Sequence, residues 1–230
     1  MIDFHSHVLP GVDDGSQSLE QTDAMLKRSY DQGVRYMVAT PHFYADEMIP
    51  ETFLANRQYA YESICDRNKN TPQLILGAEV AYFNNISCSE AVQQLQIGQT
   101  RLLLVEMPFS SWSERVVEDV CRLQDRQGLT PVLAHVERYR DRSQFPLYRD
   151  RLLAQGVLFQ SNAEGLLKRN TRSWLLKQLK AGCIHFLGTD CHNLTSRAPN
   201  LAEAAALICK KAGQDILDEI WDFSAQILSL

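Results

Sequence analysis

The chain has 230 residues, of which 45% are hydrophobic and 22% are charged, with a formal net charge of −5. This composition is ordinary for a soluble globular protein, and we expect residues 1–230 to form a single domain that is not drawn to nucleic acid by bulk charge. No apolar run is long enough to cross a membrane, and the six cysteines include no C-x-x-C pair, so we expect a cytoplasmic protein with reduced thiols.

Short apolar runs alternate with longer amphipathic segments along the chain. Seven runs read as buried parallel strands: 2–4, 36–39, 74–76, 102–105, 131–134, 157–159 and 184–187. Eight segments read as helices: 19–32, 53–67, 89–95, 114–127, 145–155, 174–180, 200–211 and 214–228. Glycines follow several of these helices just before the next strand, as helix C-caps do. The alternation predicts an α/β fold with a parallel sheet, either a barrel or a doubly wound open sheet.

Residues of the kinds that bind metal ions follow nearly every predicted strand. They are His5 and His7 after the first strand, Asp13 and Asp14 in the first loop, His42 after the second strand, Glu79 after the third, Glu106 after the fourth, His135 after the fifth, and Asp190 and His192 after the seventh. In a parallel barrel the carboxyl ends of all strands converge on one mouth, where active sites lie. This distribution therefore favours a barrel over an open sheet.

Each of these residues has an ordinary structural explanation when taken alone. An isolated His5-x-His7 pair is weak evidence, and a lone buried Glu79 is more often half of an ion pair. Glu106, however, directly follows four apolar residues, which is costly unless a cation neutralises it. Nine such ligands suffice for two or three ions that share a bridging carboxylate, and the lack of cysteine ligands favours Mn²⁺, Fe or Zn²⁺. His185 lies inside the last predicted strand, and we interpret it as a structural histidine.

Seven short segments carry a resemblance to a known family. They are M-I-D-F-H-S-H (1–7), V-D-D-G (12–15), A-T-P-H (39–42), G-A-E (77–79), V-E (105–106), A-H-V-E-R-Y (134–139) and G-T-D-C-H-N (188–193). In this order and spacing they resemble the polymerase-and-histidinol-phosphatase (PHP) superfamily. Within it they look most like the manganese-dependent tyrosine phosphatases of bacterial capsule and exopolysaccharide loci. The resemblance extends from residue 1 to about Arg197.

The resemblance implies a distorted (β/α)7 TIM-like barrel, the PHP fold, that hydrolyses phosphotyrosine by a metal-activated hydroxide. It implies three metal ions, with Mn²⁺ as the expected ion, and two of the three ligand sets share Glu79. The sets are His5, His7, Glu79 and Asp190; Glu79, Glu106 and His135; and Asp14, His42 and His192. Asp13 is then a supporting residue, while Arg138 and Arg197 match positions that contact phosphate. The implied partner is a tyrosine kinase with a tyrosine-rich tail, encoded with polysaccharide export machinery.

Several alternatives stay open at this level. The chain could be a small-molecule phosphatase such as a histidinol-phosphatase, or a non-catalytic metal-binding PHP module. Each arginine could instead form a salt bridge to a neighbour such as Glu137 or Asp141. The loop 43–47 lacks basic residues, so we assign it no role in substrate choice. The sequence also leaves open whether the protein is a homo-oligomer.

A thiol-based phosphatase is a further alternative, because Cys191 and Arg197 together spell C-x5-R, the minimal signature of those enzymes. Thiol phosphatases need a loop that wraps the phosphate closely, and this segment contains no glycine between the two residues. Cys191 also lies between Asp190 and His192. If both neighbours face metals along an extended chain, Cys191 should point away from them.

Overall fold

The computed structural model describes residues 1–65, 67, 69–141 and 145–230. These residues form nine strands: β1 (Ile2–Ser6), β2 (Tyr36–Ala39), β3 (His42–Phe43), β4 (Gln73–Leu76), β5 (Glu79–Ala81), β6 (Leu102–Glu106), β7 (Thr130–Leu133), β8 (Leu158–Asn162) and β9 (Phe186–Gly188). Every paired strand is parallel, as expected from the alternation of strands and helices. The strands occur in two pieces with the orders β1-β2-β4 and β3-β5-β6-β7-β8-β9.

Two of the predicted strands are each followed, after a two-residue break, by a second short strand. Residues 40–41 separate β2 from β3, and residues 77–78 separate β4 from β5. Pro41 has no backbone N–H to give to a ladder, which weakens pairing at the first break. Pairing continues across the breaks, because the Glu79 N–H donates to the Pro41 carbonyl at 3.0 Å. The expected count of seven separate strands therefore differs from the nine observed among the described residues.

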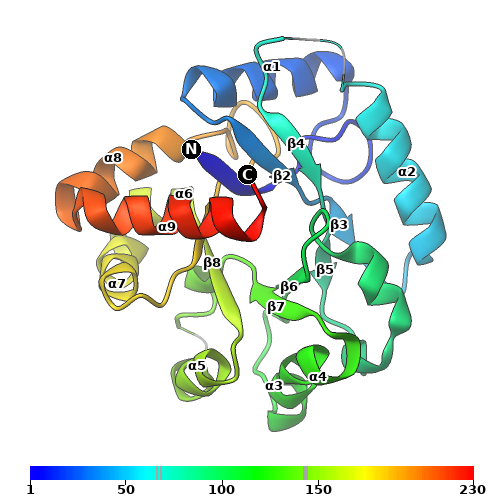
Figure 1. The fold of residues 1–230 in the computed structure, drawn as a ribbon, viewed down its shortest axis with the longest axis vertical. Helices are drawn as coiled ribbons and strands as arrows, with labels where there is room; N and C mark the ends of the chain where they lie inside the picture. Colours follow the sequence, from blue (N-terminus) through cyan, green and yellow to red (C-terminus); the bar gives the residue numbers. More distant parts are fainter. Residues whose placement is uncertain (66, 68, 142–144) are drawn as a thin grey trace.

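The sheet is curled (Figure 1), and its first and last strands, β1 and β9, are in contact. The Asp190 N–H donates to the His5 carbonyl at 2.7 Å, and the His7 N–H donates to the Cys191 carbonyl at 3.0 Å. These bonds join the segments that follow β1 and β9. The architecture is a curled parallel sheet of the TIM-like kind, not an open sheet with two free edges.

The helices mostly follow the predicted segments. They are α1 (Leu19–Asp31), α2 (Pro50–Glu62), α3 (Glu114–Cys121), α4 (Leu123–Gln127), α5 (Phe145–Ala154), α6 (Ala163–Leu167), α7 (Arg169–Lys180), α8 (Leu201–Lys211) and α9 (Gln214–Ile227), with 3₁₀ turns η1 (Ile86–Cys88), η2 (Glu90–Leu95) and η3 (Val136–Arg138). Among the described residues, none of these helices combines the length and hydropathy that a membrane span requires.

Four helix predictions need correction. The segment predicted as a helix over 89–95 forms 3₁₀ turns, and 114–127 is divided between α3 and α4. The predicted helix 174–180 begins five residues earlier, at Arg169, and is preceded by the unpredicted α6. The predicted helix 53–67 corresponds to α2, which starts earlier and ends at Glu62; part of the prediction, Asp66, lies outside the described residues.

Apolar side chains pack on both faces of the sheet. Leu103 and Val105 of β6 belong to the large core under the outer helices, while Leu102 and Leu104 alternate onto the other face. The smaller inner core includes Phe4 and Phe186, whose rings stack at 3.7 Å, and α9 covers it. The inner face of the sheet is thus closed by apolar packing below the strand ends.

Gly188 allows β9 to pack closely against β1. A Cβ placed on Gly188 would lie 2.6 Å from the Cβ of His5 and 2.8 Å from its backbone nitrogen, closer than packed atoms can come. We expect Gly188→Ala to lower the free energy of unfolding by about 3 kcal/mol and to displace His5. Gly182→Ala is the control, because a Cβ there meets nothing within 4 Å and costs only the strain of its positive φ of 66°. Equal melting temperatures for the two variants would contradict this account.

Candidate metal centre

All nine predicted metal ligands come together at the carboxyl ends of the strands. Their places are the end of β1 (His5, His7), the loop before α1 (Asp14), the start of β3 (His42), the start of β5 (Glu79), the end of β6 (Glu106), the residues after β7 (His135) and the residues after β9 (Asp190, His192). Six of them are buried, His42 and Glu106 are 12% exposed, and Asp14 is 67% exposed at the rim. The convergence predicted from the strand-end pattern is therefore present in the structure.

Glu79 is the centre of the cluster. Its Oε2 lies 3.1 Å from His5 Nε2, 3.3 Å from His7 Nε2 and 3.1 Å from His42 Nδ1. Its Oε1 lies 2.9 Å from His135 Nε2. One carboxylate thus faces four imidazoles that come from three separate segments. This is the arrangement expected of a carboxylate that bridges two ions.

Eight of the nine side chains, all but His135, fall into three overlapping groups, and within each group the ligand atoms lie within 4.8 Å of one another. The groups are His5, His7, Glu79 and Asp190; His7, Asp14, His42 and His192; and His42, Glu79 and Glu106. The first group has the same members as one predicted ligand set. The second adds His7 to a predicted set, and in the third His42 stands where His135 was predicted. The assignment of individual ligands to three ions stays a prediction.

Unpartnered polar atoms indicate that these residues fit bound cations. Among the described residues, six buried side-chain nitrogen or oxygen atoms lack a hydrogen-bond partner, and three of them face the cluster: His42 Nδ1, Glu79 Oε2 and His192 Nε2. His42 Nδ1 and Glu79 Oε2 are 3.1 Å apart without hydrogen-bond geometry. A buried polar atom without a partner is costly, and a shared cation would satisfy atoms that converge in this way. Imidazole and carboxylate donors without thiolate suit Mn²⁺, Fe and Zn²⁺.

Asp13 and Asp14 have different positions. Asp13 Oδ2 lies 2.6 Å from His7 Nδ1 and accepts the His42 N–H at 2.9 Å. A hydrogen bond from Nδ1 fixes the tautomer of His7, so that its Nε2 lone pair faces the cluster. Asp14 Oδ1 instead lies 3.5 Å from His42 Nε2 and 3.3 Å from His192 Nε2. Asp13 therefore supports a histidine, and Asp14 faces the cluster directly.

Two amides at the end of β8 belong to the site and were not predicted. Gln160 Oε1 lies 3.1 Å from His5 Nδ1 and accepts the His135 N–H at 2.7 Å. Asn162 Nδ2 donates to Asp190 Oδ2 at 2.7 Å. Both residues follow the predicted strand 157–159 with the i, i+2 spacing that places side chains on one face. The strand-end rule could have found them if amides had been considered with the metal-binding residue types.

The two central carboxylates are held in the ionised form. Burial raises the pKa of Glu79, but the charge of His5 and hydrogen bonds from the surrounding imidazoles outweigh it, and the pKa lies well below its usual range. Burial likewise opposes the charge on Asp190, and His5 and His7 overcome it, so its pKa is also well below the ordinary value. Both carboxylates are therefore available as anionic ligands at neutral pH.

The imidazoles differ in basicity. Burial and the charge of His7 lower the pKa of His192 to about 4, so His192 is neutral and has a free lone pair at neutral pH. For His135, burial lowers the pKa, but hydrogen bonds to Glu106 and Glu79 raise it to about 9. A cation that binds at His135 must therefore displace a proton.

Arg138 and Arg197 both reach the same carboxylate from opposite sides. Arg138 Nη2 pairs with Asp190 Oδ2, and Arg197 Nη2 lies 2.7 Å from Asp190 Oδ1. The alternative partners named from the sequence, Glu137 and Asp141, are wrong as salt-bridge partners of these arginines among the described residues. The side chains are 34% and 32% exposed. A role in phosphate binding stays a prediction.

Two of the candidate ligands have strained backbones. His135 has a φ of 35° and Asp190 a φ of 53°, in the left-handed region that side chains disfavour. Such strain persists only where the surroundings hold it, and it is commonly found at functional sites. It directs both side chains into the cluster.

Cys191 points away from the cluster, as predicted, but for a different reason. Asp190 is not extended, so simple alternation along a strand does not apply. Cys191 instead lies in the large apolar core, fully buried, and burial raises the pKa of its thiol. A thiol in that environment is a poor nucleophile. His185 is also structural, because its Nδ1 accepts the Phe159 N–H at 3.0 Å.

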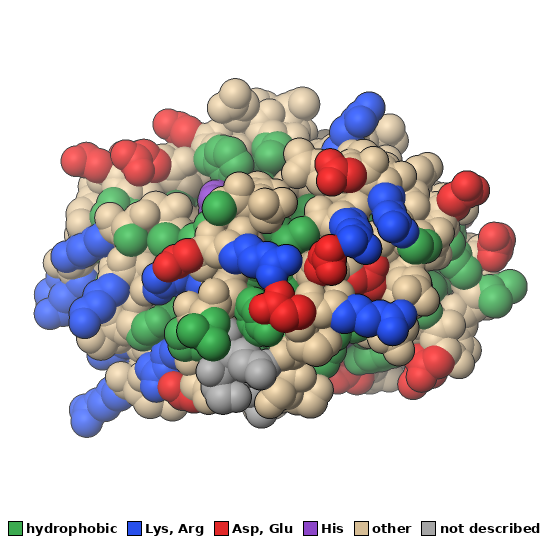
Figure 2. All heavy atoms as spheres, turned by 90° about the horizontal axis from the view of Figure 1, so that it is seen from below, with side chains coloured by type: hydrophobic (Ala, Val, Ile, Leu, Met, Phe, Trp, Pro, Cys, Tyr) green, Lys and Arg blue, Asp and Glu red, His purple; other side chains and the backbone are tan. Residues whose placement is uncertain are grey.

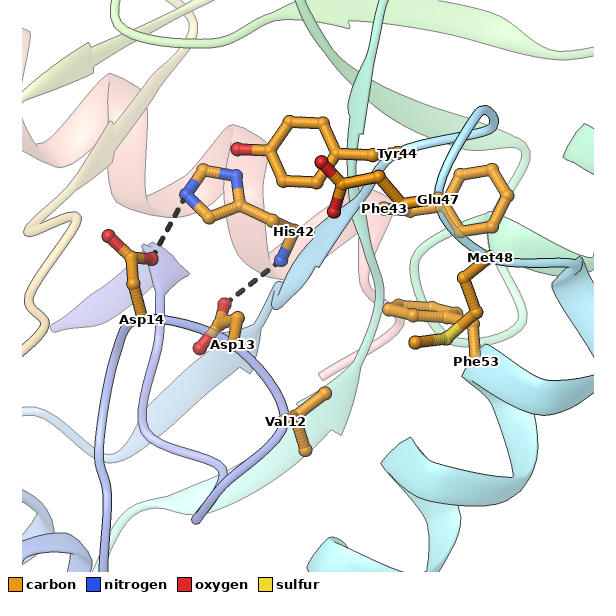
Figure 3. Close-up of a pocket in the computed structure, with 9 residues that line it drawn as sticks. All are labelled: Val12, Asp13, Asp14, His42, Phe43, Tyr44, Glu47, Met48 and Phe53. Carbon is orange, nitrogen blue, oxygen red and sulfur yellow. Dashed lines mark hydrogen bonds and ion pairs between the residues drawn. The ribbon is translucent and has the colours of Figure 1, made fainter.

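A pocket lies beside the cluster. It is lined partly by the loop 43–47, to which the sequence analysis assigned no role. Its cavity volume is about 380 Å³, and Figure 3 shows Asp14 and His42 on one side of it. Phe43, Met48 and Phe53 supply apolar walls. The pocket thus joins an apolar space to two candidate metal ligands.

The curled parallel α/β sheet and the cluster at its strand ends define a protein of the TIM-like class with a candidate multi-metal centre. The family model described as "Capsular polysaccharide synthesis, CpsB/CapC" matches residues 1–228. The chain belongs to this family. The resemblance to capsule-locus phosphatases stated from the sequence is confirmed at the family level.

Similar proteins cover nearly the full chain. Tyrosine-protein phosphatase CpsB of Streptococcus pneumoniae is 30% identical over 96% of this chain and 95% of its own length. Tyrosine-protein phosphatase CpsB of Streptococcus agalactiae serotype III (strain NEM316) is 29% identical over 98% and 97%. Tyrosine-protein phosphatase YwqE of Bacillus subtilis (strain 168) is 27% identical over 94% and 87%.

One solved structure has the same fold. It comes from a study of YwqE of Bacillus subtilis and CpsB of Streptococcus pneumoniae, described as unique metal-dependent tyrosine phosphatases. The TM-score is 0.87 at 23% identity, over 100% of this chain and 94% of that one. This agreement supports the curled-sheet architecture.

Glu79 should matter more for metal retention than Asp13. Glu79→Gln removes the charge that faces four imidazoles, whereas Asp13→Asn changes a hydrogen bond to one of them. We expect Asp13→Asn to weaken metal binding by about 10- to 100-fold and Glu79→Gln to weaken it further. The measurement is metal content by elemental analysis after equilibrium with Mn²⁺, with circular dichroism to verify folding. A larger loss in the Asp13 variant would mean that the bridging role belongs elsewhere.

Proposed function

We propose that this chain is a metal-dependent protein-tyrosine phosphatase that acts in capsular or exopolysaccharide synthesis. The observation that carries the proposal is the cluster around Glu79 with Arg138 and Arg197 at its rim. Relatives named tyrosine-protein phosphatase cover nearly the whole chain, and the matching family model concerns capsular polysaccharide synthesis. Together they favour phosphoryl hydrolysis over a non-catalytic metal-binding role.

The protein side chains would hold the phosphoryl group for in-line attack. Arg138 and Arg197 flank the cluster and present planar forks that can bind two phosphoryl oxygens each. His5, His7 and Asp190 hold fixed positions through Gln160, Asp13 and Asn162 respectively. Bound divalent cations supply a water nucleophile at neutral pH and charge stabilisation in such sites. The chain's own contribution is the preorganised geometry that spares reorganisation during the reaction.

The pocket beside His42 supports an aryl phosphate as substrate. Phe43, Met48 and Phe53 offer apolar surface for a phenyl ring, while His42 belongs both to the pocket and to the metal cluster. A tyrosyl ring in this space would present its phosphate toward the cations. A phosphoserine side chain is shorter and has no ring to fill the pocket. A phenolate also leaves more readily than an alkoxide.

We also propose the finer features that the family resemblance implies. Residues 1–230 act as one phosphatase domain, and β2 with β3 and β4 with β5 each count as one strand of a (β/α)7 PHP barrel. The cofactor is Mn²⁺ in three sites, with Fe or Zn²⁺ as alternatives. The catalytic set is Arg138, Arg197, Asp190 and His192. The substrate is a tyrosine kinase with a tyrosine-rich tail, dephosphorylated in the cytoplasm.

Metal removal tests the proposed reaction. Chelation should abolish hydrolysis of a phosphotyrosine peptide, and added Mn²⁺ should restore it, because bound cations would supply the water nucleophile and the charge stabilisation. A phosphoserine peptide and histidinol phosphate serve as comparison substrates, and we expect phosphotyrosine to be the best of the three. Full activity after thorough demetallation would rule out the metal mechanism, and preference for histidinol phosphate would assign the site to a small-molecule phosphatase.

Cys191 separates the metal mechanism from the thiol mechanism. Cys191→Ser should keep most of the activity, because the thiol is buried in the core and its pKa is raised by burial. His192→Ala and Asp190→Asn should lose nearly all activity, since both side chains face the cluster. Turnover of the three variants is compared at equal metal content. An inactive, folded and fully metallated Cys191→Ser protein would establish the thiol mechanism instead.

A further inference from the structure

A second concave site, outside the metal centre, is lined by basic side chains. We call it the basic groove; its lining residues are Arg169, Arg172, Ser173, Leu176, Lys177, Lys180 and Lys211. Its cavity volume is about 520 Å³, and no acidic residue is among the described residues that line it. Lys and Arg side chains gather on the left of the face in Figure 2, the side on which α7 lies in Figure 1. This concentration stands out in a chain with 28 acidic and 23 basic residues.

Helix stability explains only part of this charge. Lys177 and Lys180 lie in the last turn of α7, and Lys211 in the last turn of α8, where cations complement the helix dipole. Arg169 and Arg172 lie at the opposite end, in and next to the first turn of α7, which contains no acidic residue. Positive charge is unfavourable there.

Arg172 has a structural role, but Arg169 has none. Arg172 Nε and Nη2 donate to the carbonyls of Leu166 and Leu167 at 2.9 Å and 2.5 Å. Arg169 is exposed and makes no side-chain hydrogen bond or ion pair within the part of the chain that the structure describes. Its charge is therefore available to a ligand and is unexplained by the fold.

The groove begins near the mouth of the metal centre. Arg140 follows η3, the turn that supplies Arg138, and its Nη1 donates to the carbonyl of Asn170 in the first turn of α7. On the other side, α6 joins α7 to β8, whose Asn162 contacts Asp190. The 12 residues of α7 extend about 18 Å from this point. An extended peptide covers that length with about five or six residues.

We propose that the basic groove binds an anionic segment of the same polypeptide that presents its phosphotyrosine to the metal centre. The statement that one polypeptide occupies both sites rests on the proposed phosphatase function. The groove supplies five cations for carboxylate or phosphate groups, and Ser173 and Leu176 between them can contact a peptide backbone and its side chains. Substrates with acidic or further phosphorylated residues near the target tyrosine are the preferred class.

Two other polyanions fit the groove less well. Membrane binding normally adds apolar side chains that insert among the lipids, and none of the exposed large hydrophobic residues among the described residues lies on α7 or α8. Single-stranded nucleic acid is normally held by aromatic stacking, and no aromatic side chain lines the described part of the groove. A peptide needs neither feature.

The first experiment measures binding without catalysis. The groove variant combines Arg169→Gln, Lys177→Gln and Lys180→Gln, and the matched control removes three exposed cations elsewhere: Lys27→Gln, Lys69→Gln and Arg126→Gln. A fluorescent glutamate-rich peptide without phosphotyrosine is titrated at low salt, with anisotropy as the readout. We expect the control to match the unmodified protein and the groove variant to bind about tenfold more weakly. Added salt should remove most of the difference, because screening weakens exposed charge pairs.

The second experiment measures hydrolysis of two phosphotyrosine peptides, one with a run of glutamates five or six residues from the phosphotyrosine and one with glutamines in the same places. The groove variant should raise KM about tenfold for the glutamate peptide, with kcat unchanged, and leave the glutamine peptide unaffected. If no phosphotyrosine peptide is hydrolysed, the proposed function fails, while the anisotropy result still reports on the groove.

Two results would overturn the proposal. One is equal peptide binding by the groove variant, the control and the unmodified protein. The other is loss of binding to phosphatidylserine vesicles in the groove variant with peptide binding unchanged, which would assign the groove to a lipid surface.

Discussion

The site depends on the burial of the Glu79 carboxylate, which is unfavourable in free energy unless nearby groups compensate its charge. Its side chain is 1% exposed, and a charge so buried is tolerated only if its surroundings compensate it. The compensation comes from His5, His7, His42 and His135, which lie on three segments that are far apart in the sequence. The curl of the sheet is what makes this possible, because it turns distant strand ends toward a common centre. Fold and site are therefore linked through a single side chain.

Around this centre, a second layer of polar residues fixes the first. Asp13 orients His7, Gln160 contacts His5, and Asn162 donates to Asp190. These contacts cost little conformational entropy, because strands and short turns already hold their backbones. Preorganisation of this kind allows charged groups to act without moving during a reaction. The strained φ values of His135 and Asp190 are part of the same preorganised state.

The sequence contained enough information to predict the parallel α/β fold and the nine residues that converge. Both follow largely from local rules, because apolar runs mark strands and polar residues after them mark the mouth. The choice of Asp14 over Asp13 came from the family resemblance. It did not predict what depends on tertiary contacts. The division of strands at Pro41 and near Gly77, and the pairing of Arg138 and Arg197 with Asp190, are decided by neighbours far away in sequence.

Other features of the structure were not predicted because their signal in the sequence was too weak or was not considered. The 3₁₀ turns of η2 have the apolar spacing of a helix but too few residues to settle the type. Gln160 and Asn162 stood at a strand end, yet amides are common and carry little information alone. The pocket wall formed by the loop after His42 could not be predicted, because apolar residues in a loop have no fixed periodicity.

The meeting of β1 and β9 has a consequence for how the chain resists unfolding. His5 and His7 lie near the N-terminus, and Asp190 and His192 follow β9, so most of the polypeptide lies between the two pairs. A cation held by both pairs would act as a reversible cross-link that closes this long loop and restricts the unfolded ensemble most strongly where chain entropy is greatest. Metal supply would then determine how long the molecule survives heat and proteases as well as whether it can react. In a cell short of metal, such a protein would be removed by degradation instead of accumulating in an inactive form.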